Sequence, residues 1–144
     1  PASSLSGFSA YDTSNAYVDN DGGFYTWYTA TAGTGTYSMS SGNTSVSICP
    51  KGWRLPTSGD DGEFQALYNN YNSSSILMFN PINLTLSGYV RSSSRGDQGS
   101  DGYYWSSTVY SDNLAYNLHL NASNVYPASL NYKILGFYVR CIAR

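Results

Sequence analysis

The sequence predicts an α+β fold with one main helix and several short antiparallel strands. Three features indicate this fold: helical periodicity near residues 60–71, a period of two at residues 114–121, and frequent turn residues between short strand-like stretches. A chain of 144 residues has the usual length of one domain and buries roughly 68–70% of its extended surface on folding. We therefore expect a single domain over residues 1–144, with residues 1–23 as a candidate peripheral N-terminal segment.

The first third of the chain, up to residue 48, is rich in Ser, Thr, Gly and Tyr. Residues 24–28 form its clearest strand-like stretch, and Gly-containing turn signals separate the short segments. Aromatic residues are interspersed throughout, which indicates that this segment packs on the rest of the chain rather than forming a linker.

The main helix is predicted to begin near Asp60. Ser58, Asp60 or Asp61 can cap its N-terminus, and Glu63 interacts favourably with the helix dipole. A second, shorter helical or extended piece covers residues 76–79. The apolar face of the main helix repeats at positions i, i+3, i+4 and i+7, occupied by Phe64, Leu67, Tyr68 and Tyr71.

The remainder of the chain is predicted to be β-structure. Strands are expected at residues 84–89, 103–108, 114–121 and 136–142, with a polar loop at residues 92–102. In the strand at 114–121, alternation predicts a core face of Leu114, Tyr116, Leu118 and Leu120 and an outward face of Asn117, His119 and Asn121. The core residues expected elsewhere are Trp53, Leu55, Phe64, Leu67, Trp105, Phe137 and Val139.

Charge and hydropathy argue against several partner classes. Charged residues make up only 11% of the chain and the net charge is −2, so no basic surface is expected to bind nucleic acid. No apolar run approaches the roughly 20 residues that span a bilayer, so this segment is not expected to insert into a membrane. The chain contains 15 Tyr residues among many Ser, Asn and Gly, a mixture that antibody paratopes use and that also suits a β-rich extracellular protein.

Catalytic, metal and cofactor motifs are weak. His119 is the only histidine, and its setting beside Asn117 and Asn121 is typical of an exposed strand rather than a triad. Residues 19–23 resemble a calcium loop, but the glycine and glutamate of that motif are misplaced or absent, which favours a turn. We expect no enzyme activity, no metal and no cofactor.

Cys49 and Cys141 are the only cysteines and lie 92 positions apart, which excludes a CxxC metal or redox site. One interpretation is two free thiols in a reducing compartment. The Lys-poor surface rich in Tyr, Ser and Asn instead suggests export, and exported proteins keep disulfides. We therefore favour a disulfide and an extracellular or cell-surface location.

Three stretches of the chain together resemble a known family. Residues 49–57 read Cys-Pro-Lys-Gly-Trp-Arg-Leu-Pro-Thr and run into the predicted helix; residues 105–108 read Trp-Ser-Ser-Thr; residues 136–141 read Gly-Phe-Tyr-Val-Arg-Cys. In this order they resemble the Fibrobacter succinogenes major paralogous domain, a bacterial branch of the C-type-lectin-like fold. The resemblance covers about residues 24–144. It implies an irregular, usually exported α+β domain in which Cys49 and Cys141 are joined. The calcium and sugar motifs of the lectins themselves are absent.

A second resemblance is to the variable proteins of diversity-generating retroelements, which display hypervariable residues on the same fold. These elements mutate adenines near the 3′ end of a gene, often in Asn codons, and such changes cannot produce Lys, Gln, Glu, Trp or Met. None of these five residue types occurs in residues 110–132. The location of this Tyr- and Asn-rich stretch, just before an ordinary C-terminal strand, supports the resemblance more than its composition does.

These observations lead to the hypothesis of a non-catalytic binding module. We expect its partner to be a protein or a cell-surface ligand, and we expect the module to be a monomer. The alternative is a structural or adhesive module of the cell envelope without a diversified ligand site. The ligand face is predicted from Tyr and polar side chains of the C-terminal half: Tyr103, Tyr110, Asp112, Asn113, Asn117, His119, Asn121, Asn124, Asn131 and Tyr132.

Overall fold

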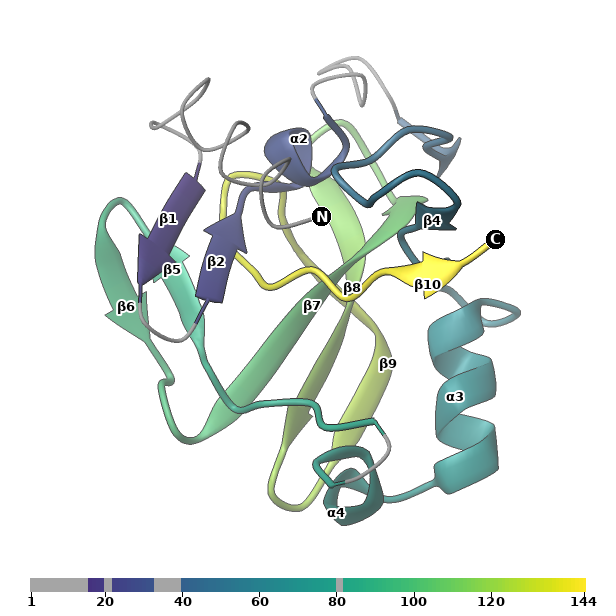
Figure 1. The fold of residues 1–144 in the computed structure, drawn as a ribbon, viewed down its shortest axis with the longest axis vertical. Coiled ribbons are helices and arrows are strands. Elements are labelled where there is room, and N and C mark those ends of the chain that lie inside the picture. Colours follow the sequence, from purple (N-terminus) through teal and green to yellow (C-terminus); the bar gives the residue numbers. More distant parts are fainter. Residues whose placement is uncertain (1–15, 20–21, 33–39, 80–81) are drawn as a thin grey trace.

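The computed structural model describes residues 16–19, 22–32, 40–79 and 82–144, and its centre is a four-stranded antiparallel sheet (Figure 1). The strands follow the order β3-β7-β8-β9. The expected α+β class with antiparallel strands is therefore confirmed. The bounds of the sheet strands are β3 Gly42–Asn43, β7 Asp101–Val109, β8 Leu114–Asn121 and β9 Val125–Tyr132.

Three two-stranded sheets and three helices surround the central sheet in the part of the chain that the structure describes. The paired strands are β1 (Ala16–Asp19) with β2 (Gly22–Tyr25), β5 (Tyr89–Arg91) with β6 (Ser94–Gly96), and β4 (Trp53–Arg54) with β10 (Ile142–Ala143). The helices are α2 (Trp27–Ala30), α3 (Glu63–Tyr71) and α4 (Ser74–Leu77). No helix among the described ranges is both long and apolar enough to cross a bilayer.

Both faces of the strands β7 and β8 are covered. Neighbouring residues of β7 illustrate this, since Trp105 belongs to one core cluster and Tyr104 to the other. Successive side chains of a strand point to opposite faces, so the two clusters lie on opposite sides of the sheet. The first, on the side of α2 and the C-terminal segment, includes Trp27, Leu55, Trp105, Ala115 and Phe137. The second, on the side of α3 and α4, includes Phe64, Leu77, Leu84, Leu118 and Leu120.

The prediction for β8 is only half correct. Leu118 and Leu120 are fully buried as expected, whereas Leu114 and Tyr116 are half-buried. Asn117, expected to face outward, is completely buried, which corrects that prediction. The reason is that the opposite face of β8 is also covered, by the first core cluster, so alternation in this strand separates two cores rather than a core from solvent.

Helix α3 is present with Phe64 buried as expected, but its capping differs from the prediction. Neither Ser58, Asp60 nor Asp61 caps it: the N-cap residue is Gly62, which makes no side-chain capping bond. Thr57 caps the helix instead. Its Oγ1 accepts a hydrogen bond from the N–H of Glu63 at 3.1 Å, and its carbonyl accepts one from the N–H of Phe64 at 3.1 Å.

An ion pair ties the start of α3 to β4. The guanidinium of Arg54 donates to both carboxylate oxygens of Glu63, and the backbone N–H of Thr57 donates to Oε2 of Glu63 at 2.8 Å. The hydrogen bonds from Arg54 hold the pKa of Glu63 below its usual range, against the opposing effect of burial. The folded state is therefore more stable when the carboxylate of Glu63 is ionised.

The Glu63→Gln variant should be less stable than the wild type at about pH 7, by about 1 kcal/mol or less because both side chains are about a third exposed. The folded-state pKa of Glu63 is depressed, so the contribution is present above the unfolded value of about 4.3 and is lost as the pH falls through the folded pKa. The stability difference, measured by chemical denaturation, should shrink from about pH 7 to about pH 3. A difference that is equal at both pH values would contradict the role of the ion pair.

The C-terminal segment crosses the middle of the molecule (Figure 1). Phe137 bridges to Tyr25, Gly136 to Val90, and Tyr138 to Tyr104, so this segment joins three elements that are distant in sequence. The strand predicted over residues 136–142 is therefore not continuous: isolated bridges precede the short strand β10. Pairing of β10 with β4 then brings the C-terminus beside the segment that leads into α3.

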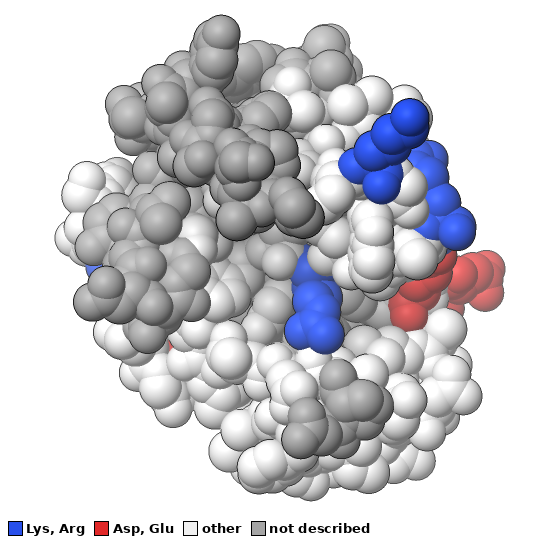
Figure 2. All heavy atoms as spheres, in the orientation of Figure 1, with Lys and Arg blue, Asp and Glu red and all other residues white. Residues whose placement is uncertain are grey.

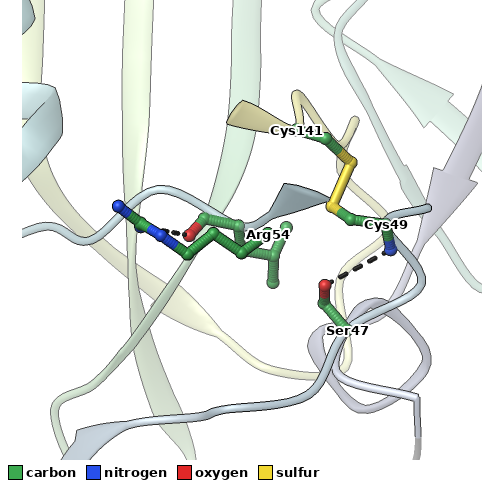
Figure 3. Close-up of a disulfide and its surroundings, with 5 residues drawn as sticks. Ser47, Cys49, Arg54 and Cys141 are labelled. Carbon is green, nitrogen blue, oxygen red and sulfur yellow. Dashed lines mark hydrogen bonds between the residues drawn. A yellow bond between two sulfur atoms is a disulfide. The ribbon is translucent and has the colours of Figure 1, made fainter. Parts of the chain in front are cut away.

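Cys49 and Cys141 form a disulfide with 5.8 Å between their Cα atoms, and no described cysteine is free (Figure 3). The predicted pairing is confirmed. The N–H of Cys49 donates to Oγ of Ser47 at 3.3 Å, and Nη1 of Arg54 donates to the carbonyl of Leu55 at 3.2 Å nearby. The disulfide thus joins the loop before β4 to the residue that immediately precedes β10.

Most of the expected core residues are buried, and one is not. Leu55, Phe64, Trp105 and Phe137 have at most 4% of their surface exposed, and Leu67 and Val139 are half-buried. Trp53 is 47% exposed, so its assignment to the core is wrong. The physical reason is that β4 pairs only with β10, a two-residue pair at the surface, which leaves one side of the indole uncovered.

Several element boundaries also differ from the predictions. The strand expected at residues 84–89 begins only at Tyr89, and the loop at 92–102 contains β6. Strand β9 was not predicted, because its sequence contains Pro127 and lacks a regular apolar alternation. Of the candidate N-terminal segment 1–23, residues 1–15 and 20–21 lie outside the described residues, and the remainder belongs to the β1–β2 pair.

Candidate ligand-binding site

The turn between β7 and β8 carries an exposed patch of aromatic and polar side chains. Tyr110 and Tyr132 are 52% and 61% exposed, and Asp112 and Asn113 are also exposed. Tyr132 is brought to this turn because β9 pairs with β8 in a register that places it opposite Leu114. Ile134, which follows β9, is exposed as well. We call Tyr110, Asp112, Asn113, Tyr132 and Ile134 the turn patch.

Lys133 forms hydrogen bonds with the backbone of this turn. Its N–H donates to the carbonyl of Asn113 at 2.9 Å, and its Nζ donates to the carbonyl of Asp112 at 2.9 Å. The side chain of Lys133 is fully buried, with Nζ 4.7 Å from the ring centroid of Trp27, and burial lowers the pKa of the ammonium. These two contacts are to main-chain carbonyls, which any residue type at positions 112 and 113 would offer, while the negative charge of Asp112 opposes the effect of burial on the pKa of Lys133.

A polar pocket of about 260 Å³ lies next to the turn patch. The segment from Asn131 to Leu135 connects the two: Asn131 and Leu135 line the pocket, whereas Tyr132 and Ile134 belong to the patch. This volume is below the roughly 300–1,000 Å³ typical of complete small-molecule sites, so the pocket suits one group of a larger ligand. It is lined by Tyr89, Arg91, Asp97, Tyr103, Asn131, Leu135 and Phe137.

Within this pocket, Tyr103 is fixed on several sides. Its hydroxyl donates to Oδ2 of Asp97 at 2.7 Å, and its ring stacks on Phe137 with 4.9 Å between centroids. Burial, followed by the hydrogen bond to Asp97, raises the pKa of Tyr103 well above its usual value. The hydroxyl therefore remains a protonated donor, and Tyr103 forms a rigid wall of the pocket.

An aromatic row continues from Tyr103 across the sheet. His119 of β8 stacks between Tyr103 of β7 and Tyr126 of β9, with centroid distances of 4.5 and 5.1 Å. Its Nε2 lies 2.7 Å from Oδ1 of Asp101. Burial alone raises the pKa of Asp101, but hydrogen bonds, first of all that with His119, outweigh this and lower it. The imidazole is thus held by aromatic stacking on both faces and by its contact with Asp101.

Asn117 does not belong to this surface. It is fully buried beneath the first core cluster, where Nδ2 donates to the carbonyl of Ser129 at 3.2 Å and Oδ1 has no partner among the described residues. The register of the β8–β9 pair shifts between Asn117 and His119, with the extra residue on β9. Asn117 is therefore a structural residue rather than a ligand contact, which corrects the sequence prediction.

Asn121 and Asn124 lie at the opposite end of the sheet, in the β8–β9 hairpin. Oδ1 of Asn121 accepts the N–H groups of Ser123 and Asn124, both at 2.9 Å, and so forms the turn itself. Strand β8 has eight residues, so at about 3.3 Å per residue the hairpin lies roughly 23 Å from the turn patch. The structure thus groups Tyr110, Asp112, Asn113 and Tyr132 at the turn, and Tyr103 and Asn131 line the polar pocket beside it. His119, which pairs with Tyr103, lies two residues from Asn121 on β8 and is nearer to the β8–β9 hairpin than to the turn. Asn121 and Asn124 belong to that hairpin and not to the turn patch.

Sequence reasoning missed several residues of this surface. Ile134 and Leu135 fall just beyond the Tyr- and Asn-rich stretch, and Tyr89 and Arg91 belong to a strand placed too early. Asp97, in the polar loop at residues 92–102, reaches the pocket only because the β5–β6 hairpin folds toward Tyr103. The abundance of Tyr was the one signal that pointed to Tyr89 and Tyr126.

Comparisons with known proteins do not assign the chain to a family. No protein-family model matches it, no curated protein matches it, and no solved structure matches it. No group of three or more His, Cys, Asp or Glu side chains suited to a metal ion occurs within the described ranges.

Proposed function

We propose that this chain is a non-catalytic ligand-binding module whose contact surface is the turn patch together with the adjoining polar pocket. The observation that carries the proposal is the way the turn is held: Lys133 binds the carbonyls of Asp112 and Asn113 and leaves their side chains exposed. Tyr110 and Tyr132 add stiff aromatic area that loses little conformational entropy on binding. A rigid turn that presents changeable side chains separates the stability of the fold from the choice of ligand.

We propose further that the fold is C-type-lectin-like. Pairing of β4 with β10, the Cys49–Cys141 disulfide and the helix that follows the Cys-Pro-Lys-Gly-Trp-Arg-Leu-Pro-Thr stretch support this proposal. The disulfide also favours an extracellular or cell-surface location, where such bonds persist. The expected partner is a protein or another cell-surface ligand.

Diversification by a retroelement is the proposed origin of the side chains at positions 110, 112, 113 and 132 of the turn patch. Lys133, a residue type that adenine mutation of Asn codons cannot produce, is the first residue after the stretch 110–132 and holds the turn. Within that stretch the exposed positions can vary freely, whereas the buried Asn117 and the turn-forming Asn121 cannot.

The neighbouring DNA tests the proposed diversification. A near-identical copy of the 3′ coding segment should lie beside a reverse transcriptase gene. Its mismatches should fall at adenines in the codons of Tyr110, Asp112, Asn113 and Tyr132, and codon 117 should be unchanged. The absence of such a repeat, or mismatches concentrated in codons of buried residues, would refute it.

A displayed library tests binding directly. Positions 110, 112, 113 and 132 are randomised, and the folded clones are sorted against a panel of unrelated purified proteins. We expect clones with different sequences at these positions to bind different proteins, because the contacts change while the scaffold does not. A matched library at the distant, exposed positions Ala122, Ser123 and Asn124 should yield far fewer binders.

The alternative is a structural or adhesive module of the cell envelope. One observation favours it: in the described sheet β9 is an edge strand, and Tyr126 and Leu130 on it are 46% and 38% exposed. Such an edge can pair with a strand of another chain. Failure of every folded clone of the turn-patch library to bind, together with concentration-dependent self-association of the parent chain, would favour this alternative.

A further inference from the structure

A second pocket, of about 350 Å³, lies beside α3 on the other side of the molecule from the polar pocket. Helix α3 contributes one wall, the segment after α4 a second, and the C-terminal segment a third. We call it the α3 pocket. Its lining residues are Trp53, Pro56, Glu63, Phe64, Leu67, Ile82, Leu84, Arg140, Cys141, Ile142 and Ala143.

The walls of the α3 pocket are apolar and firmly held. Phe64 and Leu84 belong to the second core cluster and are 4% and 3% exposed, so they form a fixed floor. Cys141 is held by the disulfide to Cys49. Trp53 lines the same pocket while 47% exposed, which places a large aromatic surface in contact with both the pocket and solvent. An exposed indole at an apolar pocket is a feature of sites that bind apolar groups.

The two charged residues of the α3 pocket differ in their partners. The carboxylate of Glu63 is already engaged by Arg54 and by the N–H of Thr57. Arg140 is exposed, and its guanidinium makes no hydrogen bond or ion pair with any described residue. The surface over α3 and α4 is otherwise largely uncharged, with the acidic side chains gathered at one edge (Figure 2). The pocket therefore combines an apolar interior with one available positive charge.

We propose that the α3 pocket binds a small amphiphilic carboxylate, with its apolar part between Trp53, Leu67 and Ile142 and its carboxylate on Arg140. Arginine binds a carboxylate through two parallel N–H···O bonds, which fixes the orientation of the ligand as well as its charge. The volume lies at the lower end of the range for small-molecule sites, which suits a single short chain or ring. This site is independent of the proposed binding of partners by the turn patch.

Three ten-carbon probes that differ only in their head group test the proposal: decanoate, decanol and decylamine, each below its micelle concentration. Binding is followed by calorimetry and by tryptophan fluorescence. Trp27 and Trp105 are fully buried, so an emission change at the α3 pocket reports mainly on Trp53. We expect decanoate to bind at least ~10-fold more tightly than decanol, as a charge-assisted hydrogen bond allows. Decylamine should bind more weakly still.

Two variants distinguish binding in the α3 pocket from nonspecific adsorption of the probes to the protein surface. Arg140→Gln should weaken decanoate binding about tenfold and leave decanol binding unchanged, because only the charged contact is removed. Arg144→Gln is the matched control: this arginine is also exposed near the C-terminus but does not line the pocket, so binding should be unaffected. No decanoate binding, equal binding of all three probes, or equal effects of the two variants would each overturn the proposal. None of these outcomes bears on the turn-patch library.

Discussion

Replacing Trp105 with alanine should lower the free energy of unfolding by about 3–5 kcal/mol. The indole is fully buried, stacks on Phe137 with 4.3 Å between ring centroids, and donates from Nε1 to the carbonyl of Tyr25 at 2.7 Å. The variant therefore leaves a large cavity and an unpaired carbonyl at the point where β2, β7 and the C-terminal segment meet. At roughly 2–4 °C per kcal/mol, calorimetry should show a Tm lower by roughly 6–20 °C.

Trp53→Ala is the matched control for this prediction. The same side chain is removed, but Trp53 is 47% exposed and belongs to the surface pair β4–β10, so the loss of stability should be far smaller. Equal losses in the two variants, or a Trp105→Ala protein that melts within about one degree of the parent, would show that the first core cluster is placed incorrectly.

Removing the disulfide should destabilise the protein by about 4–5 kcal/mol as an upper figure. Cys49 and Cys141 are 92 positions apart, and a bond that closes so long a loop removes much conformational freedom from the unfolded chain. Since domains are commonly stable by about 5–15 kcal/mol, this is a large share of the total. Chemical denaturation of the Cys49→Ala, Cys141→Ala double variant measures it.

Two controls accompany the disulfide measurement. Thiol titration of the denatured, unreduced protein should find no free thiol, and two titratable thiols would contradict the bond. The wild type, after reduction, should melt close to the double variant and should recover its original Tm on reoxidation. A reduced protein as stable as the oxidised one would show that the bond does not constrain the chain.

Local patterns in the sequence predicted the features that depend on a single signal, such as helical periodicity or a pair of cysteines. The α3 periodicity placed Phe64 in the core, and the two cysteines were paired correctly. Strand β8 was predicted half correctly, because alternation identifies two faces but does not say whether each is covered. The second face of β8 is covered by segments near both ends of the chain, and such long-range packing leaves little trace within the strand itself. Asn117 was misplaced for this reason.

The candidate site was likewise predicted only in part, because some of its residues are brought together by tertiary packing. Exposed Tyr110, Asp112, Asn113 and Tyr132 were predicted from composition and position, and the register of β8 and β9 brings them together. The role of Lys133 was not predictable, since a buried lysine that binds two carbonyls is uncommon and no local pattern signals it. The polar pocket combines residues of three separate segments, so only the tertiary structure reveals it.

On the proposed function, the contact surface can change without loss of the fold, and tolerance to randomisation measures this property. One library varies the exposed positions Tyr110, Asp112, Asn113 and Tyr132; its matched partner varies four positions of β8 that are fully buried. The buried set is Ala115, Asn117, Leu118 and Leu120. The quantity compared is the fraction of displayed clones that resist proteolysis.

We expect most clones of the exposed library to resist the protease, because exposed substitutions usually change stability by no more than about 0.5 kcal/mol and Lys133 holds the turn through backbone carbonyls. Most clones of the buried library should be cleaved, since they place cavities or unpaired polar groups in the core. If the exposed library is cleaved as often as the buried one, the turn-patch positions are fixed by packing, and this chain is not a binding module with an exchangeable surface.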